Sequence, residues 1–142
     1  MNGATFLKIM HVDDNLADIE LTKETLEEAK LQCSIVPAHD GQHALEQLEE
    51  YLRRGEPLPD LILLDLNMPR LDGRGFLAEL RARRELKAIV VVILTSSDAE
   101  LDIVRSYELG ANCYVSKPVG LVEFQKIVHS IEHFWLTVVK LP

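Results

Sequence analysis

Short continuous apolar runs alternate along the chain with segments whose apolar residues recur at helical spacing. Five such runs predict β-strands, over residues 6–12, 34–36, 61–64, 88–94 and 113–115. Apolar residues three and four positions apart predict a helix after each strand. A chain that alternates strands with helices in this way predicts an α/β fold, in which a parallel sheet carries helices on both faces.

The first three expected helices have apolar faces, which should pack on the sheet. These faces are Ile19, Thr22, Leu26 and Ala29 in the first helix, Ala44, Leu45, Leu48 and Leu52 in the second, and Phe76, Leu77 and Leu80 in the third. Gly and Pro residues interrupt the pattern between the elements. They do so most clearly at residues 53–59, which we expect to form a loop.

Length and charge narrow the range of possible functions. The chain has 142 residues, of which 47% are hydrophobic and 27% charged, so we expect one globular domain over residues 1–142. A net charge of -8 with no basic run disfavours binding of DNA or RNA. No segment approaches the about 20 apolar residues that span a bilayer. Two isolated cysteines, Cys33 and Cys113, fit a reducing compartment, and we expect a cytoplasmic protein.

Polar residues follow four of the predicted strands at the position where each strand stops. Asp13 and Asp14 follow the first strand, Asp65 the third, Thr95 the fourth and Lys117 the fifth. Ligands of parallel sheets bind beyond the carboxyl ends of the strands, so we expect these side chains to meet. Three neighbouring carboxylates repel one another unless a cation separates them, and oxygen ligands suit Mg²⁺. The pattern therefore predicts a magnesium site.

The same residues offer what phosphoryl transfer requires. The ammonium of Lys117 and the hydroxyl of Thr95 can each meet a phosphoryl oxygen, and such transfer depends chiefly on positioning and charge neutralisation. A carboxylate can also be the nucleophile and form an aspartyl-phosphate. Structural roles are the alternatives: Asp13 and Asp14 could lie at a helix N-terminus, Asp65 in a turn, and Thr95 at a helix cap.

Motifs at these strand ends resemble those of response-regulator receiver domains of two-component signalling. They are Val12-Asp13-Asp14-Asn15, Leu63-Leu64-Asp65-Leu66-Asn67-Met68-Pro69, Asp72-Gly73, Thr95-Ser96 and Lys117-Pro118. The resemblance covers residues 6–131, nearly the whole chain. It implies a doubly wound, five-stranded parallel sheet of the flavodoxin-like and CheY-like type, with strand order 2-1-3-4-5 and five helices. His11 departs from the family, in which an apolar residue commonly precedes the acidic pair.

The resemblance implies a phosphoacceptor and a metal site. Asp65 is the implied phosphoacceptor, which takes its phosphoryl group from a phosphohistidine of a partner histidine kinase. Asp13, Asp14, Asp65 and the backbone carbonyl of Asn67 are the implied ligands of Mg²⁺. The protein would then be a signalling protein that assists its own phosphorylation and dephosphorylation, rather than an enzyme.

The resemblance also implies a response to phosphorylation. Lys117 would pair with the phosphoryl group and form a cis peptide bond with Pro118, since only X-Pro bonds adopt that form at low cost. Thr95 would move toward the phosphate, and Tyr114 would follow as an aromatic switch. Ordinary packing is the alternative role for Tyr114.

The two ends of the domain resemble a narrower group within this family. The opening Val12–Asp18 and the ending Ile131–Pro142 are similar to small stand-alone regulators that partner phytochrome-type histidine kinases. Apolar residues in the tail, 132–142, lie beyond the usual end of the family and predict burial against another chain. We expect a homodimer through the fourth helix, fifth strand, fifth helix and tail. A monomer whose tail folds back is the alternative.

Three other functions compete with this interpretation. An aspartyl-phosphate phosphatase would carry Asp-x-Asp after the first strand, whereas Asp65-Leu66-Asn67 follows the third strand and ends in Asn. A receiver-like adaptor that works without phosphorylation would keep the same fold. A phosphate shuttle within a multistep relay would share every site residue.

Overall fold

The computed structural model describes residues 7–28, 33–65, 73–95 and 113–116, with the backbone alone for Glu28, Thr95 and residues 113–116. In chain order the elements are β1 (Leu7–Val12), α1 (Leu16–Glu28), β2 (Cys33–Ala38), α2 (Gly41–Arg54), β3 (Leu61–Asp65), α3 (Gly73–Ala82), β4 (Val90–Thr95) and β5 (Cys113–Ser116). The helices expected after β4 and β5 lie outside the described residues. From β1 to β4, strands and helices alternate as the sequence predicts.

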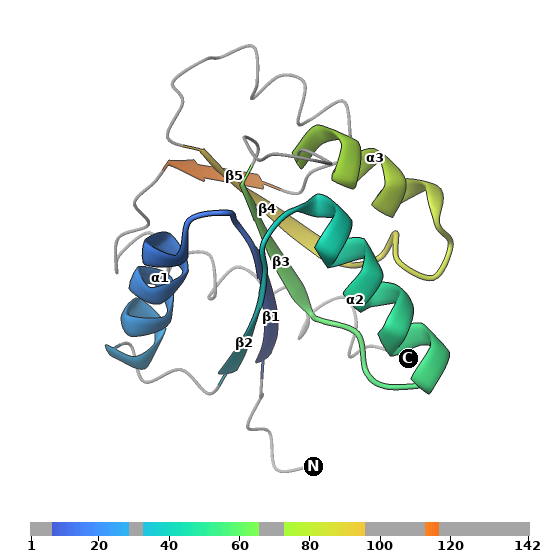
Figure 1. Ribbon diagram of the computed structural model, residues 1–142, viewed down its shortest axis with the longest axis horizontal. Helices are drawn as coiled ribbons and strands as arrows, with labels where there is room; N and C mark the ends of the chain where they lie inside the picture. Colours follow the sequence, from blue (N-terminus) through green and yellow to red (C-terminus); the bar gives the residue numbers. More distant parts are fainter. Residues whose placement is uncertain (1–6, 29–32, 66–72, 96–112, 117–142) are drawn as a thin grey trace, which may run out of the picture.

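The five strands form one parallel sheet in the order β2-β1-β3-β4-β5, which confirms the expected topology (Figure 1). β1 is the neighbour of β3, with Val12 opposite Leu64 in the register of the two strands. Because the chain first adds β2 on one side of β1 and then β3 on the other, the direction of winding reverses between β1 and β3. Ligands of doubly wound sheets bind beyond the strand ends at such a point.

Helices cover both faces of the sheet, with α1 on one side and α2 and α3 on the other (Figure 1). On one face, Met10 and Val12 of β1 belong to a core cluster with residues of α2 and α3. On the other face, Ile9 of β1 belongs to a cluster with Leu26 of α1. All of β3 is buried, which explains why its sequence is a continuous apolar run.

The apolar faces expected for the helices are confirmed with one exception. Ile19, Thr22 and Leu26 of α1, Ala44, Leu45 and Leu48 of α2, and Phe76, Leu77 and Leu80 of α3 are buried. Leu52 is instead 36% exposed, so its assignment to the α2 core face is wrong. Tyr51 packs against the core instead of Leu52. The Nζ of Lys8 lies 3.8 Å from the centre of the Tyr51 ring. Ala29 lies outside the described residues.

The start of β4 differs from the predicted strand, which began at residue 88. Ile89 is part of a turn, in which its N–H donates to the carbonyl oxygen of Leu86 at 3.1 Å. Nη1 of Arg81 donates to the carbonyl oxygens of Lys87 and Ile89, at 2.7 and 3.0 Å. Because the arginine and the turn use these backbone groups, the strand begins at Val90 despite the β-branched run before it.

α2 extends further than the predicted loop allowed, through Arg54, and both of its ends are capped. The side chain of Asp40 accepts the N–H of His43 at 2.8 Å at the N-terminus. At the C-terminus, Gly55 has φ 67° and its N–H donates to the carbonyl oxygen of Leu52. A left-handed residue of this kind is the usual position of glycine after a helix.

β2 is an edge strand and is longer than the predicted residues 34–36. It runs from Cys33 to Ala38 and includes Pro37, whose carbonyl oxygen accepts a hydrogen bond from Nε2 of Gln47 in α2 at 3.0 Å. Proline is tolerated at a sheet edge, where its missing N–H removes no bond of the ladder.

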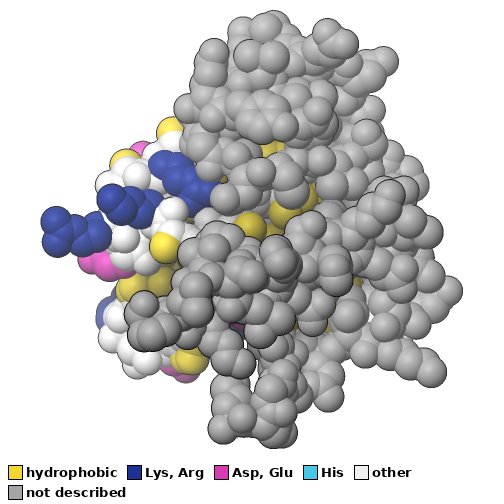
Figure 2. All heavy atoms as spheres, turned by 180° about the vertical axis from the view of Figure 1, so that it is seen from behind, with side chains coloured by type: hydrophobic (Ala, Val, Ile, Leu, Met, Phe, Trp, Pro, Cys, Tyr) yellow, Lys and Arg dark blue, Asp and Glu magenta, His cyan; other side chains and the backbone are white. Residues whose placement is uncertain are grey.

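Charged side chains mark the surface on the side of α2 and α3. Seen from behind, Lys and Arg side chains project from this side of the molecule (Figure 2). Arg83, in the turn after α3, pairs with Glu49 of α2 at 2.6 Å and with Glu79 of α3 at 3.6 Å. None of the helices in the described ranges has both the length and the apolar character that crossing a membrane requires.

Candidate functional site

The carboxyl ends of β1 and β3 bring acidic residues to one edge of the sheet. Val12 and Leu64 are register partners, so the residues that follow them, Asp13 and Asp65, are neighbours. Asp65 in turn pairs with Leu94 of β4, which directly precedes Thr95. The register of the sheet therefore places three of the expected site residues side by side along the backbone.

Asp13 is held by hydrogen bonds at its backbone and at its side chain. Its N–H donates to the carbonyl oxygen of Ala38 at 2.9 Å, and its Oδ1 accepts the N–H of Asn15 at 2.9 Å. The residue is fully buried. A hydrogen bond from a backbone N–H to a carboxylate is among the stronger kinds, so this side chain is well oriented.

Asn15, rather than either aspartate, caps the N-terminus of α1. Its Oδ1 accepts the N–H groups of Ala17 at 2.9 Å and of Asp18 at 3.3 Å. An asparagine in this position satisfies backbone donors that the first helical turn leaves open. Asp13 and Asp14 lie just before this cap, next to the N-terminus of α1.

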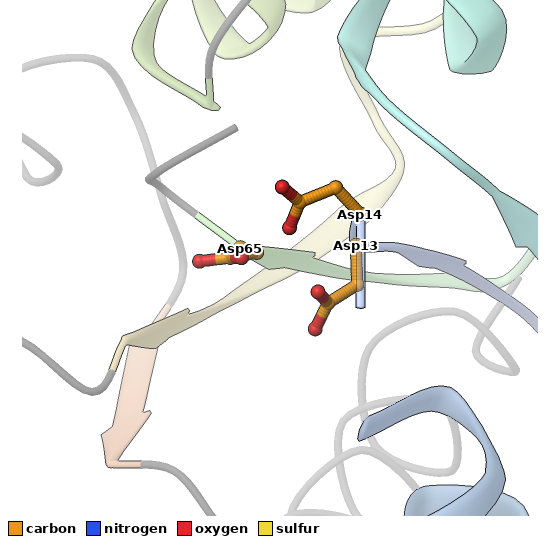
Figure 3. A group of neighbouring side chains, drawn as sticks. All are labelled: Asp13, Asp14 and Asp65. Atoms are coloured by element: carbon orange, nitrogen blue, oxygen red, sulfur yellow. The ribbon is translucent and has the colours of Figure 1, made fainter. Parts of the chain in front are cut away.

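Asp13, Asp14 and Asp65 form a compact cluster of carboxylates. One oxygen atom of each lies within 4.8 Å of those of the other two. Figure 3 shows Asp13 and Asp14 projecting from the end of β1 beside Asp65 at the end of β3. Asp14 is exposed while the other two residues are buried, so the cluster can be reached from solvent.

The cluster has the donor set of a site for a hard divalent cation. All three ligand atoms are carboxylate oxygens, which Mg²⁺ and Mn²⁺ prefer. The three oxygens lie within 4.8 Å of one another, so rotation of the side chains could bring them onto one cation. The residues present therefore fit the metal that the sequence predicts.

His11 is a neighbour of the cluster to which the sequence assigned no role. It is fully buried in β1, and its Nε2 lies 3.5 Å from Oδ2 of Asp13. The signal in the sequence was its position, because residues two apart in a strand point to the same face. His11 and Asp13 therefore lie on the same side of β1.

The remaining site residues of the sequence prediction are described only in part or not at all. Thr95 ends β4 and pairs with Ser116 of β5, and Tyr114 pairs with Ile93. Their side chains lie outside the described part of the structure, as do Asn67, the Lys117–Pro118 bond and the tail 132–142. Their roles stay predictions.

Comparisons with known proteins agree with the fold and show the family. Residues 9–129 match the family described as Response regulator receiver domain. Response regulator Rcp1 of Synechocystis sp. is 44% identical over 137 residues, which are 94% of this chain and 92% of Rcp1.

Two solved structures of response regulators superpose on nearly the whole chain. Phosphorylated cyanobacterial phytochrome response regulator RcpA has a TM-score of 0.75 and 43% identity, and the match covers 97% of this chain and 99% of RcpA. The Mn²⁺-bound form of Rcp1 has a TM-score of 0.72 and 40% identity, over 96% of this chain and 99% of Rcp1. The similarity therefore extends over the whole length of these relatives.

Proposed function

This chain belongs to the response regulator receiver family, and we propose that Asp65 accepts a phosphoryl group from a phosphohistidine of a histidine kinase in a Mg²⁺-dependent reaction. The observation that carries the proposal is the meeting of Asp13, Asp14 and Asp65 at the ends of β1 and β3. Asp65 is the last residue of a fully buried strand. The strand therefore holds the nucleophile in place without relying on a loop.

The transfer exchanges one bond to phosphorus for another. The P–N bond of the phosphohistidine breaks while a carboxylate oxygen of Asp65 forms a P–O bond, and the imidazole leaves. Asp13, Asp14 and the backbone carbonyl of Asn67 would hold Mg²⁺, which when bound supplies positive charge to the phosphoryl oxygens. The proposed role of Asp13 as a metal ligand agrees with its fixed orientation, because the N–H of Asn15 donates a hydrogen bond to its Oδ1.

Residues in and directly after β4 and β5 would complete the site and transmit its phosphorylation to the protein surface. Thr95 would donate its hydroxyl to a phosphoryl oxygen, and Lys117, in cis linkage to Pro118, would bind another. Tyr114 would change its position with Thr95. The register supports this proposal because Thr95 lies next to Leu94, the partner of Asp65, and Tyr114 lies one pair away on β5. A changed surface would then carry the signal to a downstream protein.

The similarity to phytochrome response regulators suggests the partner. Rcp1 and RcpA cover almost the whole chain, and RcpA is a phytochrome response regulator. We propose a phytochrome-type histidine kinase as phosphodonor, in the cytoplasm, for a single receiver domain over residues 1–142. The proposed homodimer would use residues 132–142 with the fourth helix, fifth strand and fifth helix.

Incubation with Mg²⁺ and a small acyl phosphate, followed by mass spectrometry of the intact protein, tests the phosphoacceptor. We expect a gain of one phosphoryl group that is absent in Asp65→Asn and in samples containing a chelator. Asp60→Asn is the matched control, because Asp60 lies at the opposite end of the same strand and should leave labelling unchanged.

Other results would favour the competing functions. No labelling of the wild-type protein would favour an adaptor that works without phosphorylation. Sustained hydrolysis of a phosphomonoester would favour a phosphatase, and rapid return of the phosphoryl group to a histidine phosphotransfer protein would favour a relay shuttle. Labelling that persists in Asp65→Asn would show that the acceptor is another residue.

Sedimentation of the protein with and without acyl phosphate tests the dimer. A mass twice that of the chain, reduced by Trp135→Ala, would support contact through the tail. A monomer under both conditions would contradict it.

A further inference from the structure

His11 is a buried polar side chain that phosphoryl transfer does not itself require. Its exposed fraction is 0%, and neither of its ring nitrogens has a hydrogen-bond partner within the described part of the structure. In the sheet register it lies between Pro37 of β2 and Leu63 of β3. Buried polar groups are nearly always hydrogen-bonded, so an imidazole in this state needs an explanation.

The described neighbours of His11 on its own face of the sheet are mostly apolar. Ile9 and Leu63 lie on the same face of the sheet and belong to an apolar cluster with Leu26 of α1. These side chains offer the imidazole N–H no acceptor. Asp13 does, because its Oδ2 lies 3.5 Å from Nε2 of His11.

We propose that His11 is a positioning residue for the divalent-cation site, with its Nε2–H directed at Oδ2 of Asp13. The N–H of Asn15 already orients Oδ1 of Asp13 from the helix side, at 2.9 Å. A donor at Oδ2 would restrict rotation of the carboxylate from the opposite side. The site would then be organised before a cation binds.

The role of His11 rests on the proposed function, since it requires Asp13 to be a metal ligand. Residues that hydrogen-bond to metal ligands change metal affinity about 10- to 100-fold when they are replaced. A receiver with an apolar residue at this position would lack this support. His11 would therefore strengthen cation binding in this chain.

Cation affinity of matched variants of the full-length protein tests the role. His11→Leu replaces the imidazole with an apolar side chain that suits its buried position, and His11→Gln places an amide N–H near the position of Nε2. Titration calorimetry with Mg²⁺ and Mn²⁺ should show about tenfold weaker binding in His11→Leu and recovery of most of the loss in His11→Gln. Equal affinity of wild type and His11→Leu would overturn the proposal, as would a folded His11→Gln that binds as weakly as His11→Leu.

A second measurement uses the wild-type protein and therefore does not depend on whether a variant folds. In the wild-type protein with ¹⁵N-labelled histidine, NMR reports which ring nitrogens carry a proton. We expect a proton on Nε2 of His11 and a change in its resonance when Mg²⁺ is added. A proton on Nδ1 alone, or a His11 resonance that does not respond at saturating Mg²⁺, would overturn the proposal.

The two proposals fail in distinguishable ways. A wild-type protein that neither binds Mg²⁺ nor accepts a phosphoryl group would overturn both the proposed function and the role of His11. A wild-type protein that does both, with a His11→Leu variant of equal cation affinity, would remove only the role of His11.

Discussion

Asp13 and Asp65 belong to neighbouring strands, and a carboxylate oxygen of each lies within 4.8 Å of one on the other. Both residues are buried, so water screens their mutual repulsion less than it would on an open surface. The repulsion destabilises the cation-free fold, and a divalent cation between the carboxylates would remove it. Cation binding should therefore be measurable through stability as well as through phosphoryl transfer.

Addition of Mg²⁺ should raise the free energy of unfolding. At a concentration one hundred times the dissociation constant, the increase should be about 2.7 kcal/mol, because the cation binds the folded chain and not the unfolded one. Urea unfolding with Mg²⁺ and with a chelator measures the difference. Asp60→Asn should keep the increase and Asp65→Asn should lose most of it. Equal unfolding midpoints with and without Mg²⁺ would contradict the metal site.

Asp60→Ala should destabilise the fold without affecting the phosphoacceptor. Oδ2 of Asp60 accepts the N–H of Lys8 at 2.9 Å, and the N–H of Asp60 donates to the carbonyl oxygen of Lys8 at 2.8 Å. Loss of the carboxylate leaves the Lys8 N–H without that acceptor, which should cost about 1–3 kcal/mol in urea unfolding. Asp60→Asn keeps an acceptor and should cost less. A loss of acyl-phosphate labelling in folded Asp60→Ala would contradict this separation.

Asp40→Ala should weaken the start of α2. The side chain of Asp40 accepts the N–H of His43 at 2.8 Å, and loss of such a cap usually costs about 1 kcal/mol. Asn caps helices nearly as well as Asp, so Asp40→Asn should unfold close to the wild type in urea. If Asp40→Asn is as unstable as Asp40→Ala, the negative charge rather than the cap matters.

Cys33 should react slowly with thiol reagents in the folded protein. Burial, with a smaller contribution from the charge of Glu27, raises the pKa of the Cys33 thiol above its ordinary value of 9.0. The reactive thiolate is therefore scarcer in the folded chain than in the unfolded chain. Alkylation rates in a Cys113→Ser background, with and without urea, measure the difference. Equal rates at the same pH would contradict the raised pKa.

The same shift predicts a loss of stability in alkali. Below the ordinary thiol pKa both states are protonated at Cys33, and its contribution to stability is fully present. As the pH rises further, the unfolded chain releases this proton first, so the free energy of unfolding falls. Cys33→Ser should show a smaller fall in urea unfolding over this range. An identical pH profile for the two proteins would exclude a contribution from Cys33.

Local patterns in the sequence predicted the alternation of strands and helices and the acidic cluster, whereas the strand order came from the resemblance to receiver domains. An apolar run that ends in an aspartate identifies both a buried strand and the edge at which it stops, as Leu61–Asp65 shows. Contacts between distant residues were not predictable in this way. Arg81 donates to the carbonyl oxygen of Ile89, and β4 therefore begins later than predicted. Tyr51 packs against the core where Leu52 was expected, and Lys8 contacts its ring.

The proposed role of His11 could not be predicted from the sequence for a similar reason. The sequence shows a histidine where an apolar residue is common, but not whether its ring turns to solvent or to the core. The structure shows that the ring is fully buried and that its Nε2 lies 3.5 Å from Oδ2 of Asp13. A departure from a family pattern becomes informative once its neighbours in space are known.

Pro37 has a consequence for how copies of this protein can associate. The N–H of Asp13 donates to the carbonyl oxygen of Ala38, so the backbone N–H and C=O of Ala38 face β1. Backbone groups of successive strand residues point to opposite sides, so those of Pro37 face away from the sheet. Pro37 has no N–H to offer there, so an incoming strand would find a gap in the row of donors. The β2 edge of the sheet therefore disfavours the edge-to-edge strand pairing by which copies of a protein assemble into fibrils.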